Sequence, residues 1–145
     1  MLDLIRKQGK EKTQDEIEAD LPVSPRVKYS GVNKSILNNT VPIDFDTPVF
    51  NVGFDTISGG EFTIPSDGQY LIQLAVELTG SSNGACAIFV DGSEVDVGGT
   101  SQNLARHRCT SILDLTAGQT VSGRFPNTVT TSSYSPLNYI AIIKL

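Results

Sequence analysis

This 145-residue chain contains one histidine and two cysteines, the residues that could act as base and nucleophile in nucleophilic catalysis. His107 and Cys109 are two positions apart, a spacing that puts both side chains on one face of a β-strand. Side chains spaced in this way are about 7 Å apart, too far for the hydrogen bond by which a histidine activates a thiol. We therefore expect His107 to be a partly buried structural residue, and we predict no catalytic residue and no enzyme.

Metal binding through oxygen ligands is the second chemistry that the sequence offers. The stretch Asp91-Gly92-Ser93-Glu94-Val95-Asp96 places three carboxylates within six residues, and Asp44, Asp46 and Asp55 add more. Calcium prefers such ligands, but the spacing matches no known calcium loop, and Asp-Gly is first of all a turn signal. We expect solvated turns at these positions, with no metal and no cofactor.

The cysteines and glycines offer no further site. Cys86, Cys109 and a single histidine are too few for a zinc set, and a disulfide framework would need more cysteines. We expect both thiols to be reduced and to lie in the core. The pairs Gly59-Gly60 and Gly98-Gly99 lack the helix and the lysine of a phosphate-binding loop, so we interpret them as turns.

The length and net charge of the chain limit the kinds of partner that it could bind. A chain of 145 residues fits one domain, and its net charge of −5 with a pI near 4.7 argues against a nucleic-acid partner, which requires a basic face. There is no apolar run of about 20 residues, so we expect no membrane span. The first ten residues lack the apolar core of a secretion signal, and we expect synthesis and folding in a cytoplasm.

A long strand in the middle of the chain is the element that would organise these groups. After a short strand at 62–64 and a Pro-Ser-Asp-Gly turn at 65–68, apolar residues occupy alternate positions: Tyr70, Ile72, Leu74, Val76 and Leu78. The other face of the same strand carries Leu71, Gln73, Ala75 and Glu77, so it is also partly apolar. A strand with two such faces requires a partner on each side.

Short apolar runs separated by Gly- and Asn-containing turns fill the rest of the chain and predict an all-β sandwich of eight to ten antiparallel strands. The expected strands cover residues 27–29, 41–45, 49–54, 62–64, 69–78, 85–90, 94–97, 106–115, 120–125 and 137–145. Turns or loops are expected at 55–60, 80–84, 91–92, 98–103, 117–118 and 127–135.

Residues 1–28 form a different kind of polypeptide, with six acidic and six basic side chains. Their apolar cluster is Leu2, Leu4 and Ile5, and Pro22 and Pro25 favour an extended approach to residues 29–145, the predicted globular domain. Two interpretations remain open. The segment is either a disordered tail or an anchoring arm whose Leu2-Leu4-Ile5 tip docks on another protein.

Three sequence blocks resemble the tumour necrosis factor superfamily and the globular heads of the first complement component. Ile64-Pro65-Ser66-Asp67-Gly68-Gln69-Tyr70-Leu71-Ile72 is similar to the superfamily signature that precedes its long central strand. Residues 112–121, Ile-Leu-Asp-Leu-Thr-Ala-Gly-Gln-Thr-Val, resemble a later strand pair, with Gln119 where Asp is usual. The terminal block, Tyr139 to Leu145, resembles the closing strand.

This resemblance implies a jelly roll that assembles as a homotrimer around a three-fold axis. It places six side chains inside the sandwich: Tyr70, Ile72, Leu74, Cys109, Ile140 and Ile142. It places six others at the trimer interface: Leu71, Gln73, Arg108, Tyr139, Ile143 and Leu145. Three copies of Arg108 near one axis would need water, an anion or acidic partners such as Glu77.

The predicted function combines a fold usually displayed outside cells, an expected cytoplasmic origin and a charged arm. A virus satisfies all three, because it assembles in the cytoplasm and later exposes its surface. We expect a structural protein of the bacteriophage virion surface, a capsid-decorating or fibre-type homotrimer whose residues 1–28 join a larger assembly such as a capsid. The alternatives are a receptor- or glycan-binding tip module of a phage fibre, acting through its end loops, and a secreted complement-like binding domain.

Overall fold

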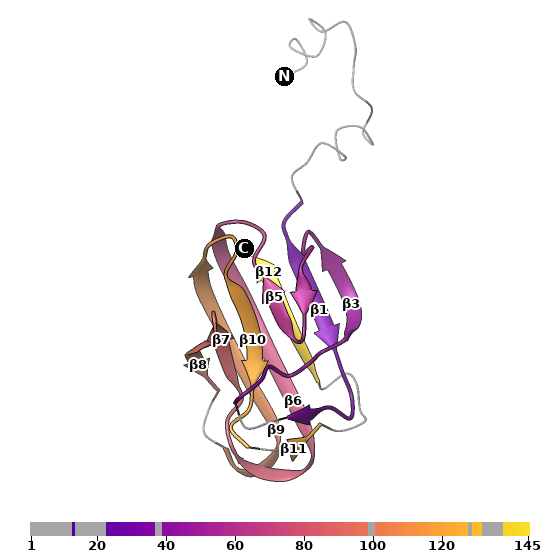
Figure 1. Cartoon of the computed structure of the whole chain (residues 1–145), viewed down its shortest axis with the longest axis vertical. Helices are drawn as coiled ribbons and strands as arrows, with labels where there is room; N and C mark the ends of the chain where they lie inside the picture. Colours follow the sequence, from indigo (N-terminus) through magenta and orange to yellow (C-terminus); the bar gives the residue numbers. More distant parts are fainter. Residues whose placement is uncertain (1–12, 14–22, 37–38, 99–100, 128, 132–137) are drawn as a thin grey trace, which may run out of the picture.

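The computed structural model describes Thr13 and residues 23–36, 39–98, 101–127, 129–131 and 138–145 (Figure 1). Within these residues the chain forms twelve strands and no helix, so no described helix could cross a membrane. The strands are β1 (Arg26–Ser30), β2 (Ser35–Ile36), β3 (Thr47–Val52), β4 (Ile57–Ser58), β5 (Glu61–Thr63), β6 (Gly68–Gly84), β7 (Ala87–Val90), β8 (Ser93–Val97), β9 (Ser101–Leu115), β10 (Thr120–Arg124), β11 (Val129–Thr130) and β12 (Tyr139–Lys144).

Ten of these strands build two five-stranded sheets. The first has the order β3-β1-β12-β6-β9 and the second the order β4-β5-β10-β7-β8, and the pairings within both sheets are antiparallel. The short strands β2 and β11 pair with each other near the lower end of the body (Figure 1). The predicted all-β sandwich of antiparallel strands is confirmed.

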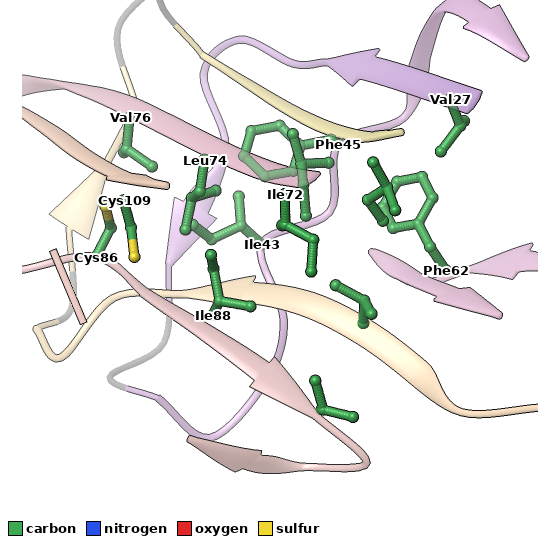
Figure 2. Close-up of a cluster of buried hydrophobic side chains, with 14 of the residues drawn as sticks. Val27, Ile43, Phe45, Phe62, Ile72, Leu74, Val76, Cys86, Ile88 and Cys109 are labelled. Carbon is green, nitrogen blue, oxygen red and sulfur yellow. The ribbon is translucent and has the colours of Figure 1, made fainter. Parts of the chain in front are cut away.

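The core lies between the two sheets and is lined by the inward side chains of both. Ile72 and Leu74 of the first sheet pack near Ile88 of the second (Figure 2). Tyr70 is fully buried, but its hydroxyl donates a 2.7 Å hydrogen bond to the backbone oxygen of Ser66, so the polar end is satisfied. Each large apolar side chain buried in this way contributes about 1.5–3 kcal/mol. All six residues predicted to point inward are buried: Tyr70, Ile72, Leu74, Cys109, Ile140 and Ile142.

The turn before β6 is hydrogen-bonded to the turn between β9 and β10. The Ile64 backbone N–H donates to the Gln119 oxygen at 2.8 Å, and the Gly118 N–H donates back to the Ile64 oxygen at 2.9 Å. The Asp67 carboxylate accepts the Ala117 N–H at 2.8 Å. The first two blocks of the superfamily resemblance therefore contact each other through backbone groups.

Residues 41–45 do not form the predicted strand. The Ile43 N–H donates to the Gly123 oxygen at 2.8 Å, but the Phe45 N–H turns back to the Ile43 oxygen at 3.0 Å, a bond between residues two apart that curls the backbone. Pro42 has no N–H to offer a ladder. Ile43 and Phe45 are buried in the core, although the segment that carries them is not a strand.

β6 is longer than predicted, because residues 80–84, expected to be a loop, belong to it. Its pairing with β9 shifts register after Glu77 and resumes at Ser82, opposite Leu104. β9 accordingly begins at Ser101, inside a segment expected to be a loop. These strand ends carry few apolar residues, so the sequence shows no alternation there to indicate a strand.

The first sheet begins inside the segment assigned to the arm. β1 starts at Arg26 and the Val27 side chain is fully buried, so residues 26–28 belong to the body. The Lys144 N–H donates to the Pro25 oxygen at 2.9 Å and extends this pairing by one residue. The predicted tip, Leu2, Leu4 and Ile5, lies outside the described residues, as do parts of the predicted end loops (99–100, 128 and 132–135).

Two glycines in the turn between β4 and β5, within the segment predicted as a turn at 55–60, give a test of the fold. Gly59 and Gly60 both have left-handed backbone, with φ of 58° and 80°. A Cβ on Gly60 would collide with the Ile43 carbonyl oxygen, whereas a Cβ on Gly59 would meet nothing within 4 Å.

We predict that Gly60→Ala lowers the free energy of unfolding by about 3 kcal/mol or more, because the cost of the left-handed backbone and the cost of the collision with the Ile43 oxygen add together. The control Gly59→Ala should cost only the left-handed strain, about 1–2 kcal/mol. Urea unfolding of the two variants measures the difference, and equal losses would contradict this account of the turn.

Candidate assembly surface

The side of the first sheet that faces away from the core is the candidate site, and we call it the outer face. Directly opposed residues of an antiparallel ladder project to the same side of a sheet, so the strand registers define rows across it. The rows are Val52, Arg26, Ile143, Leu71 and Ile112; then Phe50, Lys28, Ala141, Gln73 and Thr110; then Ser30, Tyr139, Ala75 and Arg108.

The middle of the outer face is apolar and incompletely covered. Leu71, Tyr139 and Ile143 are half-buried on the neighbouring strands β6 and β12. Beside them Ile112 is 56% exposed and Leu145 is 60% exposed. Apolar side chains that are adjacent across three strands form a continuous patch, which is typical of an interaction surface.

The structure brings the six predicted interface residues onto this face or its margin. Five of them lie in the rows above: Leu71, Gln73, Arg108, Tyr139 and Ile143. The sixth, Leu145, directly follows β12, and its N–H donates to the Gln69 oxygen at 2.8 Å. Their contact with a second copy of the chain stays a prediction.

Ile112 is a member of this patch that the sequence reasoning missed. It lies opposite Leu71 and is among the most exposed large apolar residues of the described chain. The signal was present, because Arg108, Thr110 and Ile112 share one parity on a strand and therefore one face.

Cations border the apolar patch on both sides. Arg26 and Lys28 lie on β1, and the Lys28 ammonium is 4.3 Å from the centre of the Tyr139 ring, within range of a cation–π contact. Arg106 and Arg108 are exposed on β9.

Glu77, expected as an acidic partner for Arg108, instead pairs within the chain with Arg106, its carboxylate accepting from the Nε–H at 3.1 Å. Arg108 has no ion pair with another described residue. Its guanidinium is therefore available to a group from outside the chain.

The edge of the second sheet has the opposite charge. In β8, Val95 is 46% exposed and Val97 is 45% exposed, and they alternate with the carboxylates of Glu94 and Asp96. β8 pairs with β7 and forms one edge of its sheet. This acidic and apolar edge is complementary in character to the cationic and apolar outer face.

The histidine and the cysteine considered for catalysis are both in the interior. The His107 ring is buried, more deeply than expected, and meets the Phe125 ring edge to face with centroids 4.7 Å apart. Burial raises the pKa of the Cys109 thiol to about 11, so it is protonated at neutral pH. Neither side chain faces solvent, where a substrate could reach it.

In the acidic turn considered for calcium, the carboxylates of Asp91 and Asp96 accept hydrogen bonds from neighbouring groups of the chain. Asp91 has a left-handed φ of 50°, and its carboxylate accepts the Thr120 N–H at 2.9 Å and the Gln119 side-chain amide at 3.3 Å. The Asp96 carboxylate accepts the N–H of Val97 at 2.8 Å. In the part of the chain that the structure describes, no three acidic, cysteine or histidine side chains are grouped to hold a metal.

No protein-family model and no curated protein matches the sequence of this chain. Solved structures do match in three dimensions. Murine APRIL has a TM-score of 0.65 at 16% identity, covering 85% of this chain and 100% of that one. Pika GITRL has a TM-score of 0.56 at 16% identity, covering 86% and 97%. Rabbit GITRL has a TM-score of 0.54 at 15% identity, covering 83% and 93%.

The chain has a tumour necrosis factor-like jelly-roll fold. The resemblance read from residues 64–72, 112–121 and 139–145 is thereby confirmed at the level of fold. At 15–16% identity the likeness shows the fold alone, and the assembly and role of the jelly roll depend on this chain's own surface residues.

We predict that calcium leaves the melting temperature of the protein unchanged. The carboxylates of Asp91 and Asp96 accept backbone and amide hydrogens, and no group of three possible ligands is found among the described residues. A ligand that binds only the folded state raises the melting temperature, so thermal unfolding in millimolar calcium, with a chelator as control, measures any site. A calcium-dependent rise of several degrees would contradict the assignment of these residues to a turn.

Proposed function

We propose that this chain is a structural protein that assembles as a homotrimer and forms part of a virion surface. In this proposal the jelly roll decorates a bacteriophage capsid or belongs to a fibre, and the N-terminal arm attaches it to the larger assembly. The proposed role is non-enzymatic. The observation that carries the proposal is the outer face, an apolar patch with cations at its borders.

Burial of the outer face provides the driving force for assembly. Apolar surface removed from water contributes about 25 cal/mol per Å², and Ile112 and Leu145 are more than half exposed in the single chain. Leu71 and Ile143 are directly opposed in the same row, so one partner surface can cover all four. The covered side chains lie on β6, β9 and β12 or, for Leu145, directly after β12, and these three strands are hydrogen-bonded neighbours in the sheet.

A three-fold ring requires two different patches on every copy, because each subunit meets its neighbours head to tail. The outer face is one patch, and the β8 edge supplies a complementary one. Glu94 lies opposite Phe89 and Val97 opposite Ala87, so both project to the side of the β8 edge that faces away from the core. Glu94 of one copy can face Arg108 and its neighbouring cations of the next, while Val97, which is 45% exposed, meets the apolar patch. This charge pattern favours head-to-tail contact over contact between two identical faces, which would bring like charges together.

The position of the chain ends supports a tethered arrangement. The Ser24 hydroxyl donates to the Lys144 oxygen at 2.9 Å, so the arm leaves the body beside the C-terminus. The β2–β11 pair lies at the opposite end of the body (Figure 1). An arm that anchors one end leaves the other end facing outward.

A pair of adjacent substitutions tests the trimer. Leu71→Asp puts a charge into the outer face and should leave a folded jelly roll while weakening association roughly 10- to 100-fold. Ile72→Asp buries an unpaired charge in the core and should prevent folding, because the cost of several kcal/mol is comparable to the whole stability of a domain.

Sedimentation equilibrium with circular dichroism separates the two effects. Ser58→Asp adds the same charge at an exposed position of β4 in the second sheet and serves as the control that remains trimeric. Wild-type protein that sediments as a monomer at micromolar concentration would refute the homotrimer.

Deletion of residues 1–22 tests the anchoring arm separately. We expect the truncated protein to keep the sandwich and the trimer, because the buried residues of the body begin at Val27, but to be lost from assembled particles. Electron microscopy of whole particles, with full-length protein as control, measures the occupancy. Unchanged occupancy would contradict the tether, and binding of the truncated body to host cells would favour the receptor-binding alternative.

A further inference from the structure

Two cysteines from opposite sheets meet at one end of the core. Cys86 directly precedes β7 in the second sheet, and Cys109 lies in β9 of the first. Both are free thiols, 0% and 4% exposed, and both belong to the buried cluster. Figure 2 shows their side chains beside each other at the same end of the core.

The surroundings keep both thiols protonated and unreactive. Burial raises the pKa of Cys86 to about 12 and that of Cys109 to about 11. The proximity of Cys109 also contributes to the raised pKa of Cys86, which means that the two groups interact. Because the thiolate is the reactive form, neither side chain is a nucleophile while the sandwich is closed.

The backbone segments that carry the two cysteines approach each other closely at Gly98. The Gly98 N–H donates to the Cys86 oxygen at 2.9 Å. A Cβ on Gly98 would collide with the carbonyl oxygen of Arg108, the residue before Cys109. Gly98 therefore lies between the two segments that carry the cysteines, and its lack of a side chain lets them come close.

We propose that Cys86 and Cys109 form an oxidisable pair that closes into a disulfide between the two sheets when the protein meets a small-molecule disulfide in an oxidising medium. The pair would be reduced after synthesis in a reducing compartment and would cross-link the body after exposure outside the cell. This inference concerns the core alone and does not depend on the trimer or on the arm.

The chemistry proceeds by two thiol–disulfide exchanges. The thiolate of one cysteine attacks oxidised glutathione, forms a mixed disulfide and releases one glutathione thiolate. The second cysteine then attacks the mixed disulfide, forms the Cys86–Cys109 bond and releases the second glutathione. The two cysteines together lose two protons and two electrons, and the glutathione disulfide is reduced to two thiols.

Local opening controls the rate of this reaction. A glutathione adduct does not fit in a close-packed core, so the first exchange requires the cysteine to be exposed. The β8 strand that lies next to Cys86 is a sheet edge, paired with β7 among the described strands. The reaction should therefore be slow in buffer and faster in low concentrations of urea.

Oxidation of the full-length protein tests the proposal. Reduced protein is incubated with oxidised glutathione, either folded in low urea or during refolding, and then digested without reduction. The expected product is one bridged peptide pair containing Cys86 and Cys109, lighter by two hydrogens. The bridge closes a loop of 24 residues, so the melting temperature should rise by roughly 10 °C over the reduced protein.

Cys86→Ala and Cys109→Ala are the matched controls, and neither should show this rise. If either variant fails to fold, reduced and oxidised wild-type protein still provide the comparison. Free thiols that iodoacetamide still labels after oxidative refolding would overturn the proposal. Glutathione adducts or bonds between chains in place of the internal bridge would overturn it as well.

Discussion

The pairing of β6 with β12 on one side and with β9 on the other is the constraint on which the rest of the structure depends. Side chains alternate along a strand, so the register that turns Ile72 and Leu74 toward the core also turns Leu71 and Gln73 away from it. A slip of one residue would exchange the two sets. The core and the outer face are consequently two results of a single set of backbone hydrogen bonds.

The features that the sequence could predict are those that depend on this alternation. The alternation from Tyr70 to Leu78 indicated which side chains point into the core, because a closely packed core is built mainly from apolar side chains. The same parity placed Leu71 and Gln73 on the outer face, and applied to β9 it would have placed Ile112 there too. The turn signal at Asp91-Gly92 was also informative, because few residues tolerate a left-handed backbone.

Other features depend on contacts between segments far apart in the sequence, and no local pattern carries them. Apolar residues alternate at Val41, Ile43 and Phe45, but the segment forms no strand ladder: the Ile43 N–H donates to the Gly123 oxygen, more than 75 positions later, and the Phe45 N–H turns back to Ile43. The polar end of β6 is a strand because β9 pairs with it, not because of its composition. The Arg106 partner of Glu77 likewise follows from a register that only the folded sheet defines.

Net charge alone would not have indicated the character of the surface. The chain carries −5 overall, but Arg26, Lys28, Arg106 and Arg108 all project from the outer face. The acidic groups of β8 occupy an edge of the other sheet. This separation of charge orients the molecule electrostatically as it approaches another charged surface. Salt weakens the effect, because at about 0.1 M it screens charges that are more than about 10 Å apart.

The bond between the Lys144 N–H and the Pro25 oxygen has a practical consequence, because it places the two ends of the folded body side by side. A linker of a few residues is enough to join them into a closed chain. New ends can then be opened in the exposed Asp91-Gly92 turn, where Gly92 has open space around it. The molecule is therefore suited to circular permutation, in which the attachment point of the arm moves while the pairings of both sheets are kept.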